Sequence, residues 1–333
     1  MLNNHTQTRR RLLKIIGVAA IGAISGTTLV KLTKDNRLHR VTWKGIALGS
    51  QAEITIYHPN KKEAENILKD SYKKLSKLEN LFSLYQENSQ LSLLNKNGFI
   101  ENPNPDMIEL FNLSKKYANL TNGAFDITVQ PLWNIYSESF RKNGKPPSKN
   151  EIEKALSLVD WKSISINKDL ISYKKSGMSS TLNGIAQGYI TDKISENLIN
   201  FGINNTLVQL GEYRGIGDHP DGRPWRLLLS NPEHTDSIGE IEFTNAAVAT
   251  SAGLGTPFDL AGNYHHIFDP KNGYNPNKQL QVSVLSKTAA EADALATAFL
   301  VLDQEVSEKI AKKLKVGFEI FDNNRNRKII TSI

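Results

Sequence analysis

Apolar and polar positions follow two different periods along the chain, and these periods predict both strands and helices. Within residues 41–58, Ala52, Ile54 and Ile56 alternate with polar residues, which is typical of a strand with one buried face. Within residues 62–82, the apolar residues recur every three or four positions, as they do along the buried face of an amphipathic helix. The folded part of the chain is therefore expected to begin with strand and then a long helix.

The same periods predict further elements in the remainder of the chain. Helices are expected at residues 105–118, 151–158, 183–199 and 288–302. Strands are expected at residues 163–166, 170–173, 206–210, 225–229, 238–243, 265–268, 281–285, 317–321 and 328–331. Because strands and helices mix without a regular strand–helix–strand alternation, the expected class is α+β and not a doubly wound parallel sheet.

Positive charge gathers at the N-terminus. The 333 residues carry 41 Lys and Arg against 34 Asp and Glu, a net charge of +7. Arg9, Arg10, Arg11 and Lys14 supply four of these charges and no acid lies within residues 1–30, so the remaining chain is only +3. A body of this size with so small an excess gives no reason to expect nucleic-acid binding.

The first 33 residues resemble an export signal. A basic stretch precedes residues 15–30, which are uncharged, rich in Gly and Ala and only weakly hydrophobic. The Arg9-Arg10 pair, with a hydrophobic pair two residues on, resembles a twin-arginine signal. The apolar stretch is shorter than the roughly 20 residues of a membrane-spanning helix, so we expect removal after export in preference to a membrane tether. Residues 34–333 are then expected to form the folded, periplasmic domain.

The chain contains no cysteine. This excludes disulfide bonds, thiolate metal sites and a cysteine nucleophile, and we expect no lipid anchor because such an anchor needs a cysteine. The Gly-x-Ser-x-Gly sequence of many serine hydrolases is also absent. The remaining candidate chemistry therefore depends on carboxylates, hydroxyls, histidines and backbone groups.

Two segments at expected helices carry candidate chemistry. Gly184 and Gly188 open the helix expected from residue 183, where free N–H groups could bind phosphate or small residues could simply allow close packing. Asp293 and Thr297 lie four residues apart on one helix face. They could offer oxygen ligands to Mg²⁺ or Ca²⁺; alternatively, Thr297 bonds the Asp293 carbonyl and the carboxylate faces solvent.

A third segment, residues 265–273, combines two histidines, an aspartate and a turn sequence. On the expected strand, His265 and His266 would point to opposite faces, which disfavours a zinc site there. Residues 207–217 and 247–253 are strand-then-turn segments rich in small residues, and both could line a cofactor cleft.

Seven segments occur in an order and spacing that resemble the FAD:protein FMN transferase family, also named the ApbE family. They are Leu48-Gly-Ser50, Phe82–Asn95, Asn122–Val129, Thr181–Tyr189, Ala249–Ala252, His266–Gly273 and Ala292–Ala298. Each motif is modest alone, but seven matches in order are specific together, and the similarity covers roughly residues 42–330. The resemblance implies one compact α+β domain of mixed sheets and helices, with a flavin cleft between intertwined subdomains.

The resemblance also implies the reaction, a transfer of FMN from FAD to a Thr or Ser hydroxyl of a partner protein with release of AMP. FAD is the substrate, and Mg²⁺ (or Ca²⁺) assists by neutralising the pyrophosphate. By resemblance, the metal ligands are the Gly184 carbonyl, Asp293 and Thr297, and the catalytic residues are His266, for proton handling or phosphate contact, and Asp293. FAD contacts are implied at Leu48, Tyr85, Ala124, Phe125, Asp126, Thr181, Gln187 and Ile267.

Three residues depart from the family pattern. Thr181 stands where the family has Asp, Gln187 where it has Lys or Glu, and Asn272 where it has Thr. Because Thr181 removes a charge beside the flavin and the metal, two alternatives stay open: a non-catalytic FAD-binding accessory protein and a metal-dependent FAD pyrophosphatase. Three features resemble the NosX-type branch of the family: the pattern at 181–189, the Leu-Gly-Glu at 210–212 and the export signal. That branch is linked to nitrous oxide reductase maturation and to flavinylation of the membrane protein NosR.

Overall fold

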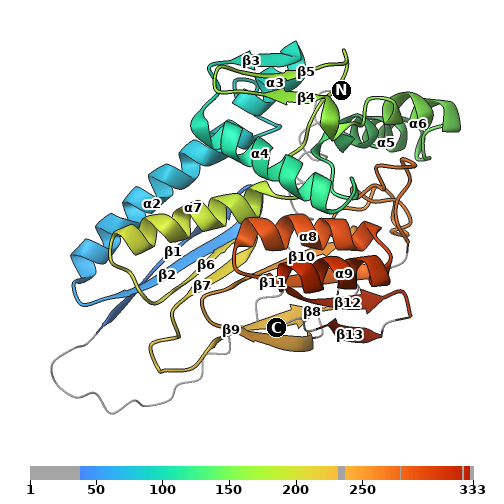
Figure 1. Cartoon of the computed structure of the whole chain (residues 1–333). Coiled ribbons are helices and arrows are strands. Elements are labelled where there is room, and N and C mark those ends of the chain that lie inside the picture. Colours follow the sequence, from blue (N-terminus) through green and yellow to red (C-terminus); the bar gives the residue numbers. More distant parts are fainter. Residues whose placement is uncertain (1–37, 232–236, 278, 325, 331–333) are drawn as a thin grey trace, which may run out of the picture.

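The computed structural model describes residues 38–231, 237–277, 279–324 and 326–330, and helices cover one face of a large sheet (Figure 1). The expected export signal, residues 1–33, lies outside the described residues. Within the described chain, no helix combines the length and apolar character needed to cross a bilayer.

The large sheet has eight strands, and every neighbouring pair is antiparallel. In spatial order the strands are β1 (His39–Ala47), β2 (Ser50–His58), β6 (Thr206–Leu210), β7 (Tyr213–Ile216), β10 (Ala247–Ala252), β11 (Gln279–Ser286), β12 (Gly317–Asp322) and β13 (Arg327–Ile330). Sequence-distant segments therefore become neighbours, because β2 pairs with β6 and β7 pairs with β10.

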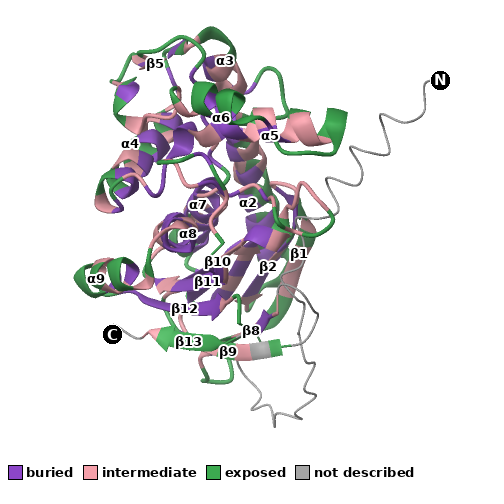
Figure 2. Ribbon diagram, turned by 90° about the vertical axis from the view of Figure 1, so that its right-hand side faces the viewer, coloured by how far each residue is buried: buried purple, intermediate pink, exposed green. Residues whose placement is uncertain are grey.

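Three helices lie on the covered face of the sheet (Figures 1 and 2). They are α2 (Lys61–Phe82), α7 (Ala186–Asn200) and α8 (Ala289–Val301), and α9 (Gln304–Leu314) follows α8. The alanine-rich α8 is buried along most of its length. Because alanine side chains are small, the backbone of this helix can approach α7 and β10 closely.

Two further groups of elements pack around the sheet and its helices. A second group above the helices contains α3 (Gln90–Asn97), β3 (Phe99–Glu101), α4 (Pro105–Leu120), η1 (Ile127–Val129), α5 (Gln130–Asn143), α6 (Lys149–Leu156), η2 (Trp161–Ser163), β4 (Ile164–Ile166) and β5 (Leu170–Tyr173). Its three strands form a small sheet in the order β3-β5-β4. The ribbon of β8 (Trp225–Ser230) and β9 (Ser237–Phe243) packs Trp225 and Phe243 against Val248 of β10.

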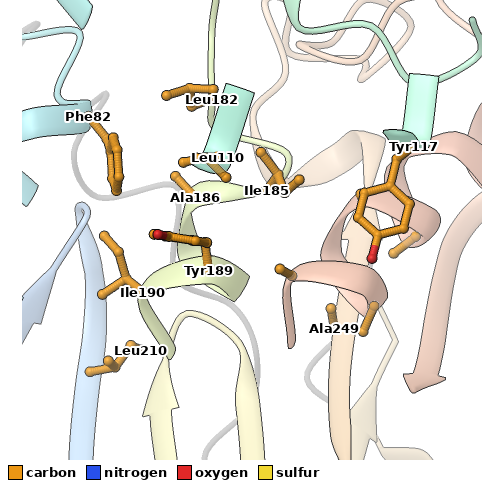
Figure 3. Packing of buried hydrophobic residues seen from close by; sticks show 14 of the residues in the cluster. Phe82, Leu110, Tyr117, Leu182, Ile185, Ala186, Tyr189, Ile190, Leu210 and Ala249 are labelled. Carbon is orange, nitrogen blue, oxygen red and sulfur yellow. The ribbon is translucent and has the colours of Figure 1, made fainter. Parts of the chain in front are cut away.

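The largest apolar cluster fills the space between the sheet and the helices (Figure 3). Tyr189 and Ile190 of α7 belong to it, together with Leu210 of β6 and Ala249 of β10. The rings of Phe82 and Tyr189 meet edge to face at a centroid distance of 5.8 Å. This core packs α7 and α8 against β6 and β10, and the candidate site lies where these elements meet.

The α+β class expected from the sequence is confirmed. So are most of the helix and strand positions, including the hairpin of β4 and β5. The patterns did not predict α3, α5 or α9, nor the strands β3 (Phe99–Glu101) and β7. The strand region at 41–58 is two strands, since Leu48 and Gly49 adopt φ of 50° and 79° and form a two-residue hairpin turn between Ala47 and Ser50.

Two expected elements are wrong in their bounds or type. The helix expected from residue 183 begins at Ala186, because the Asn183 N–H donates to Thr181 Oγ1 and closes a local turn before it. The strand expected at 265–268 is absent, and His265 forms only an isolated bridge with Pro257. The Ile267 N–H donates to the His265 ring and not to a neighbouring strand, which explains the irregular backbone there.

Candidate functional site

The buried Asp293 of α8 is held by the backbone of α7. Its Oδ2 accepts the Gly188 N–H at 3.0 Å, and the side chain is only 4% exposed. A Cβ on Gly188 would lie 2.3 Å from the Ala289 carbonyl oxygen, so only glycine permits this approach of the two helices. The alternative in which the Asp293 carboxylate faces solvent is therefore wrong.

A second set of hydrogen bonds holds the start of α8 against α7. Asp192 lies one turn after Gly188, and its two carboxylate oxygens accept the N–H groups of Ala289 and Ala290 at 2.8 and 2.9 Å. Arg214 of β7 forms an ion pair with the same carboxylate. Burial raises the pKa of Asp192, and this effect exceeds the opposing effects of Arg214 and the two N–H donors.

Thr297 lies one helical turn after Asp293 on α8, and Gly184 lies beside Thr297. Thr297 Oγ1 is 3.2 Å from Ser251 Oγ of β10, and a Cβ on Gly184 would lie 3.0 Å from the same Thr297 oxygen. Gly184 belongs to the turn before α7 and not to the helix, so its carbonyl is not committed to the helix interior. The ring of Phe125 closes this group, at 3.4 Å from the Gly184 Cβ position.

This group supplies the kind of atoms that a hard divalent cation requires. Asp293 offers a carboxylate, Thr297 a hydroxyl and Gly184 a backbone carbonyl, all of them oxygen donors. In the described parts of the chain, no Lys or Arg forms an ion pair with Asp293, and no cluster of three His, Asp or Glu side chains is suited to a metal. A cation here would therefore depend on hydroxyl and backbone oxygens as well as on carboxylates.

The start of α7 also reaches the turn between β1 and β2. Gln187 donates from Nε2 to Ser50 Oγ at 3.0 Å, and the Leu48 N–H donates to Glu79 Oε1 of α2 at 2.6 Å. A Cβ on Gly211 would lie 2.6 Å from the Gln187 Cδ, so the turn after β6 touches the same side chain. Gln187 thus meets the hairpin that contains Leu48, although Ser50 of that hairpin is 137 positions away in the sequence.

The Asp126 carboxylate accepts hydrogen bonds that hold its own loop in place. Its Oδ1 accepts the N–H and hydroxyl of Thr128 at 2.8 and 2.6 Å, and its Oδ2 accepts the Trp161 N–H at 3.2 Å. Burial raises the pKa of Asp126 to about 6, against the lowering effect of these donors. The Thr181 N–H donates to the Ile127 carbonyl at 2.7 Å, which ties this loop to the segment that precedes α7.

His266 lies in the irregular segment after η3 (Gly253–Gly255). Its N–H donates to the Thr256 carbonyl at 3.2 Å, and its buried Nδ1 has no hydrogen-bond partner in the described structure. Burial, with the neighbouring His265, lowers the pKa of His266 to about 4, so the imidazole is neutral at pH 7. The two rings lie 6.4 Å apart, and the reasoning from opposite faces of a strand does not apply because residues 265–268 are not a strand.

Three further residues are expected to contact FAD, namely Ala124, Ile267 and Tyr85. Ala124 and Ile267 are buried in the main apolar cluster, whereas Tyr85 is 74% exposed in the bend after α2. Ala124 also lines a hollow of about 590 Å³ between the end of α4 and α9, and no other residue expected to contact FAD lines that hollow. The structure therefore brings together Gln187 and the donors around Asp293, through Gly188 at the start of α7.

Sequence reasoning assigned no role to Glu212, in the turn between β6 and β7. The residue is 7% exposed, and its Oε2 accepts the Thr250 N–H at 3.2 Å. Burial, and then the charge of Asp293, raises the pKa of Glu212 well above its usual range. The sequence contains one indication of a buried acid here. In Leu210-Gly-Glu212, the acid directly follows a buried strand end and a glycine.

Comparisons with known proteins agree on one family. A sequence model of the ApbE family matches residues 48–321. The FAD:protein FMN transferase of Haemophilus influenzae is 26% identical over 318 residues, which cover 87% of this chain and 90% of that protein. The enzyme of the same description from Vibrio cholerae O1 is 28% identical over 285 residues, covering 82% and 84%.

Solved structures are similar over nearly the same length. The flavin transferase ApbE from Vibrio cholerae has a TM-score of 0.78 at 25% identity and covers 89% of this chain and 97% of its own. The ApbE protein of Thermotoga maritima also has a TM-score of 0.78, at 26% identity, with 88% and 97% covered.

Proposed function

Because the chain belongs to the ApbE family, we propose that it is an FAD:protein FMN transferase, which moves FMN from FAD to a Thr or Ser hydroxyl of a partner protein. The observation that carries this proposal is the group of oxygen donors around Asp293, which adjoins the Gln187–Ser50 contact at the start of α7. The relatives that support it have the same described activity over more than four fifths of the chain.

The reaction exchanges one phosphorus–oxygen bond for another. The acceptor oxygen forms a bond to the FMN phosphorus, and the bond from that phosphorus to the bridging oxygen breaks, so that AMP leaves with this oxygen. The acceptor hydroxyl must lose its proton. A neutral His266 can accept it, because its lowered pKa keeps a nitrogen lone pair free at neutral pH.

We assign Asp293, Thr297 and the Gly184 carbonyl as the residues that would hold Mg²⁺. The cation would neutralise the pyrophosphate charge and polarise a phosphoryl oxygen. The donor set fits, since it contains only oxygen atoms and no competing basic side chain pairs with Asp293 in the described chain. Ca²⁺ accepts the same donors and is the alternative to compare in solution.

The FAD contacts are proposed around this centre. Phe125 and Gln187 border it, and Thr181 joins the loop of Phe125 to the start of α7. Tyr85 is an exposed ring that could cover a bound flavin. The full proposed set is Leu48, Tyr85, Ala124, Phe125, Asp126, Thr181, Gln187 and Ile267, with Asp126 placing its loop through its carboxylate.

The acceptor and the location remain part of the proposal. The twin-arginine-like residues 1–33 favour a periplasmic protein, and a tether would result if that segment were kept. The NosX-type pattern of Thr181–Tyr189 favours a NosR-like membrane protein as the acceptor. Neither a nucleic acid nor a lipid anchor enters the proposal.

One assay distinguishes this function from its alternatives. The protein is incubated with FAD, MgCl₂ and an acceptor domain, and flavin fluorescence is measured on the denatured acceptor together with released AMP. With the intact acceptor, we expect one released AMP for each flavin bound to the acceptor. With an acceptor whose hydroxyl residue is replaced by Ala, we expect neither bound flavin nor stoichiometric AMP. AMP without fluorescence on the intact acceptor would favour a pyrophosphatase, and bound FAD with neither product would favour an accessory protein.

A further inference from the structure

The hollow between the end of α4 and α9 has no part in the reaction proposed above. Its volume is about 590 Å³, which is that of an ordinary ligand site. Its apolar lining comes from Leu120 of α4, from Val301 and Leu302 at the end of α8, and from Val306 and Ile310 of α9. Val306 is 40% exposed, so this apolar lining reaches the surface of the protein.

One face of α9 places apolar and basic side chains alternately along this hollow. Val306, Lys309, Ile310 and Lys313 all line it, and their spacing puts them on the same side of the helix. The buried Ala311 lies on a different face. Figure 2 shows α9 at the edge of the structure, with much of its surface exposed. The helix is therefore held by one face and presents a second, amphipathic face to the hollow.

Three lysines give the hollow an excess of positive charge. Lys309 and Lys313 line it from α9, and Lys271 lines it from the turn that follows Ile267. None of the three forms an ion pair with a residue that the structure describes. A lysine in the last turn of a helix interacts favourably with the helix dipole, but this accounts for Lys313 and not for Lys271.

Two aspartates also line the hollow, and neither cancels this charge. Asp269 Oδ1 accepts the Lys271 N–H at 2.9 Å and its Oδ2 accepts Asn272 Nδ2 at 2.7 Å, so its carboxylate is used within its own turn. Asp303 is the residue that precedes the first turn of α9, whereas Lys313 lies in the last turn of that helix. The basic side chains are therefore available to an acidic partner.

The hollow adjoins a loop that borders the proposed cation site. Ala124 lines the hollow, and the ring of the next residue, Phe125, lies 3.4 Å from the Gly184 Cβ position. On the other side, Lys271 follows Ile267, a proposed FAD contact, by four positions. A protein segment that occupies the hollow would therefore lie next to the residues that are proposed to hold FAD.

We propose that this hollow binds an acidic segment of the acceptor protein, with a docking surface formed by Val306, Lys309, Ile310, Lys313 and Lys271. The inference rests on the proposed function, because a transferase must hold its acceptor beside the flavin. Acidic side chains of the segment would pair with the lysines, and an apolar side chain would cover Val306 and Ile310. A phosphate group would use the lysines alone and leave the apolar residues uncovered, so the lining favours a peptide.

Peptide binding in the absence of FAD and Mg²⁺ tests the docking surface by itself. The purified protein is titrated into a short fluorescein-labelled peptide that contains Asp, Leu and Thr among Gly and Ser, and fluorescence anisotropy is measured. The variant Lys309→Glu with Lys313→Glu should bind about 10-fold more weakly than the wild type. Equal affinities of this variant and the wild type, or no binding by the wild type, would overturn the proposal.

The control makes the same charge change at the same spacing on another helix. Lys73 and Lys77 are exposed, four residues apart on α2, and do not line the hollow. Lys73→Glu with Lys77→Glu should therefore bind the peptide as the wild type does. An equal loss in this control would show that net charge, and not the docking surface, determines the affinity.

Changed peptides separate the charged contacts from the apolar contact. A peptide with Lys in place of Asp should not bind, and one with Ser in place of Leu should bind more weakly than the original. Val306→Ser should weaken binding of the original peptide and have little effect on the peptide that lacks Leu. Equal binding of the peptides with and without Leu would contradict docking on Val306 and Ile310.

Two further measurements keep the result decisive. FAD affinity of Lys309→Glu with Lys313→Glu should equal that of the wild type, and an equal loss of FAD and peptide affinity would assign the hollow to FAD and overturn the proposal. If that variant does not fold, Lys309→Gln with Lys313→Gln removes the charges without placing acids in the last turn of α9. It should also weaken peptide binding, and unchanged affinity would contradict the proposal.

Failure of the proposed function gives a different result. In the transfer assay, Lys309→Glu with Lys313→Glu should raise the KM for the acceptor domain by about 10-fold and change kcat less. A wild type that binds the acidic peptide through the docking surface and labels no acceptor would contradict the transferase activity and support the docking surface. A variant that labels the acceptor with the KM of the wild type would overturn the docking surface and leave the activity in place.

Discussion

The Gly188 N–H donates to Asp293 Oδ2 at 3.0 Å, and this bond joins α7, which follows the Gly184 turn, to α8, which carries the other two proposed cation ligands. It places the carboxylate of α8 against the first turn of α7, immediately after Gly184 and Gln187. The bond is possible because Gly188 has no side chain to separate the helices. Several expected outcomes depend on this relationship.

Gly188→Ala should destabilise the protein. The added Cβ would lie 2.3 Å from the Ala289 carbonyl oxygen and 2.7 Å from the Ala290 nitrogen, which are backbone atoms and can move only with α8. Alanine gains about 1 kcal/mol of helix propensity, whereas overpacking of this kind costs about 3 kcal/mol. We expect a net loss of about 2 kcal/mol in the free energy of unfolding by urea, with reduced Mg²⁺ affinity. Gly255→Ala is the control, since its Cβ meets open space, and an equal loss there would contradict the explanation.

Asp192→Asn should destabilise the protein through the start of α8. The change leaves Arg214, whose side chain is 18% exposed, without its partner, and weakens the cap on Ala289 and Ala290. Breaking a buried ion pair from one side costs about 3 kcal/mol. The double variant with Arg214→Met should lose less than the sum of the two single changes, as measured by urea unfolding. Strictly additive losses would show that the two residues do not depend on each other.

Asp293→Asn should abolish Mg²⁺-dependent FMN transfer and leave the fold intact. The amide oxygen can still accept the Gly188 N–H, but the charge that would hold the cation is gone. A loss of about 100-fold or more in the transfer rate is expected if the cation supplies several kcal/mol of transition-state stabilisation. Stability without Mg²⁺ should stay equal or rise, because burial opposes the charged form of Asp293. Asp169→Asn, in an exposed turn, is the control, and unchanged transfer by Asp293→Asn would refute the assignment.

His266 should make stability fall as the pH is lowered. Burial places its pKa at about 4 in the folded protein, below the value of 6.5 of an unperturbed histidine. The unfolded chain therefore binds a proton between these two values and the folded protein does not, so stability is full above pH 6.5 and is lost as the pH falls toward 4. Between pH 7.5 and 5.0 this contribution is about 2 kcal/mol.

The measurement compares urea unfolding of the wild type and His266→Gln at both pH values. The wild type should lose about 2 kcal/mol more than the variant over this interval. His39→Gln, at an exposed position of β1, should behave as the wild type does. Equal losses in the wild type and His266→Gln would mean that the imidazole does not stay neutral in the folded protein.

Much of the fold could be predicted from the sequence, because periodicity reports which face of an element is buried. The long helices α2 and α8 and most strands of the main sheet were predicted in this way. The prediction failed at residues 265–268, where apolar neighbours imitate a strand but the His265 ring takes the Ile267 N–H. Hydrogen bonds from side chains to a local backbone leave no periodic signal.

The family, the α+β class and the placement of Asp293 and Thr297 one helical turn apart could be predicted from the chain alone, because ordered motifs and helical spacing are local properties. Tertiary packing was needed to show that Asp293 is buried against Gly188, that Asp126 holds its own loop, and that Gln187 reaches Ser50 from 137 positions away in sequence. The physical reason is that sheet order and helix packing set these distances. The antiparallel order β6-β7-β10 and the close approach of α7 to α8 bring together residues whose spacing in the chain carries no information about contact.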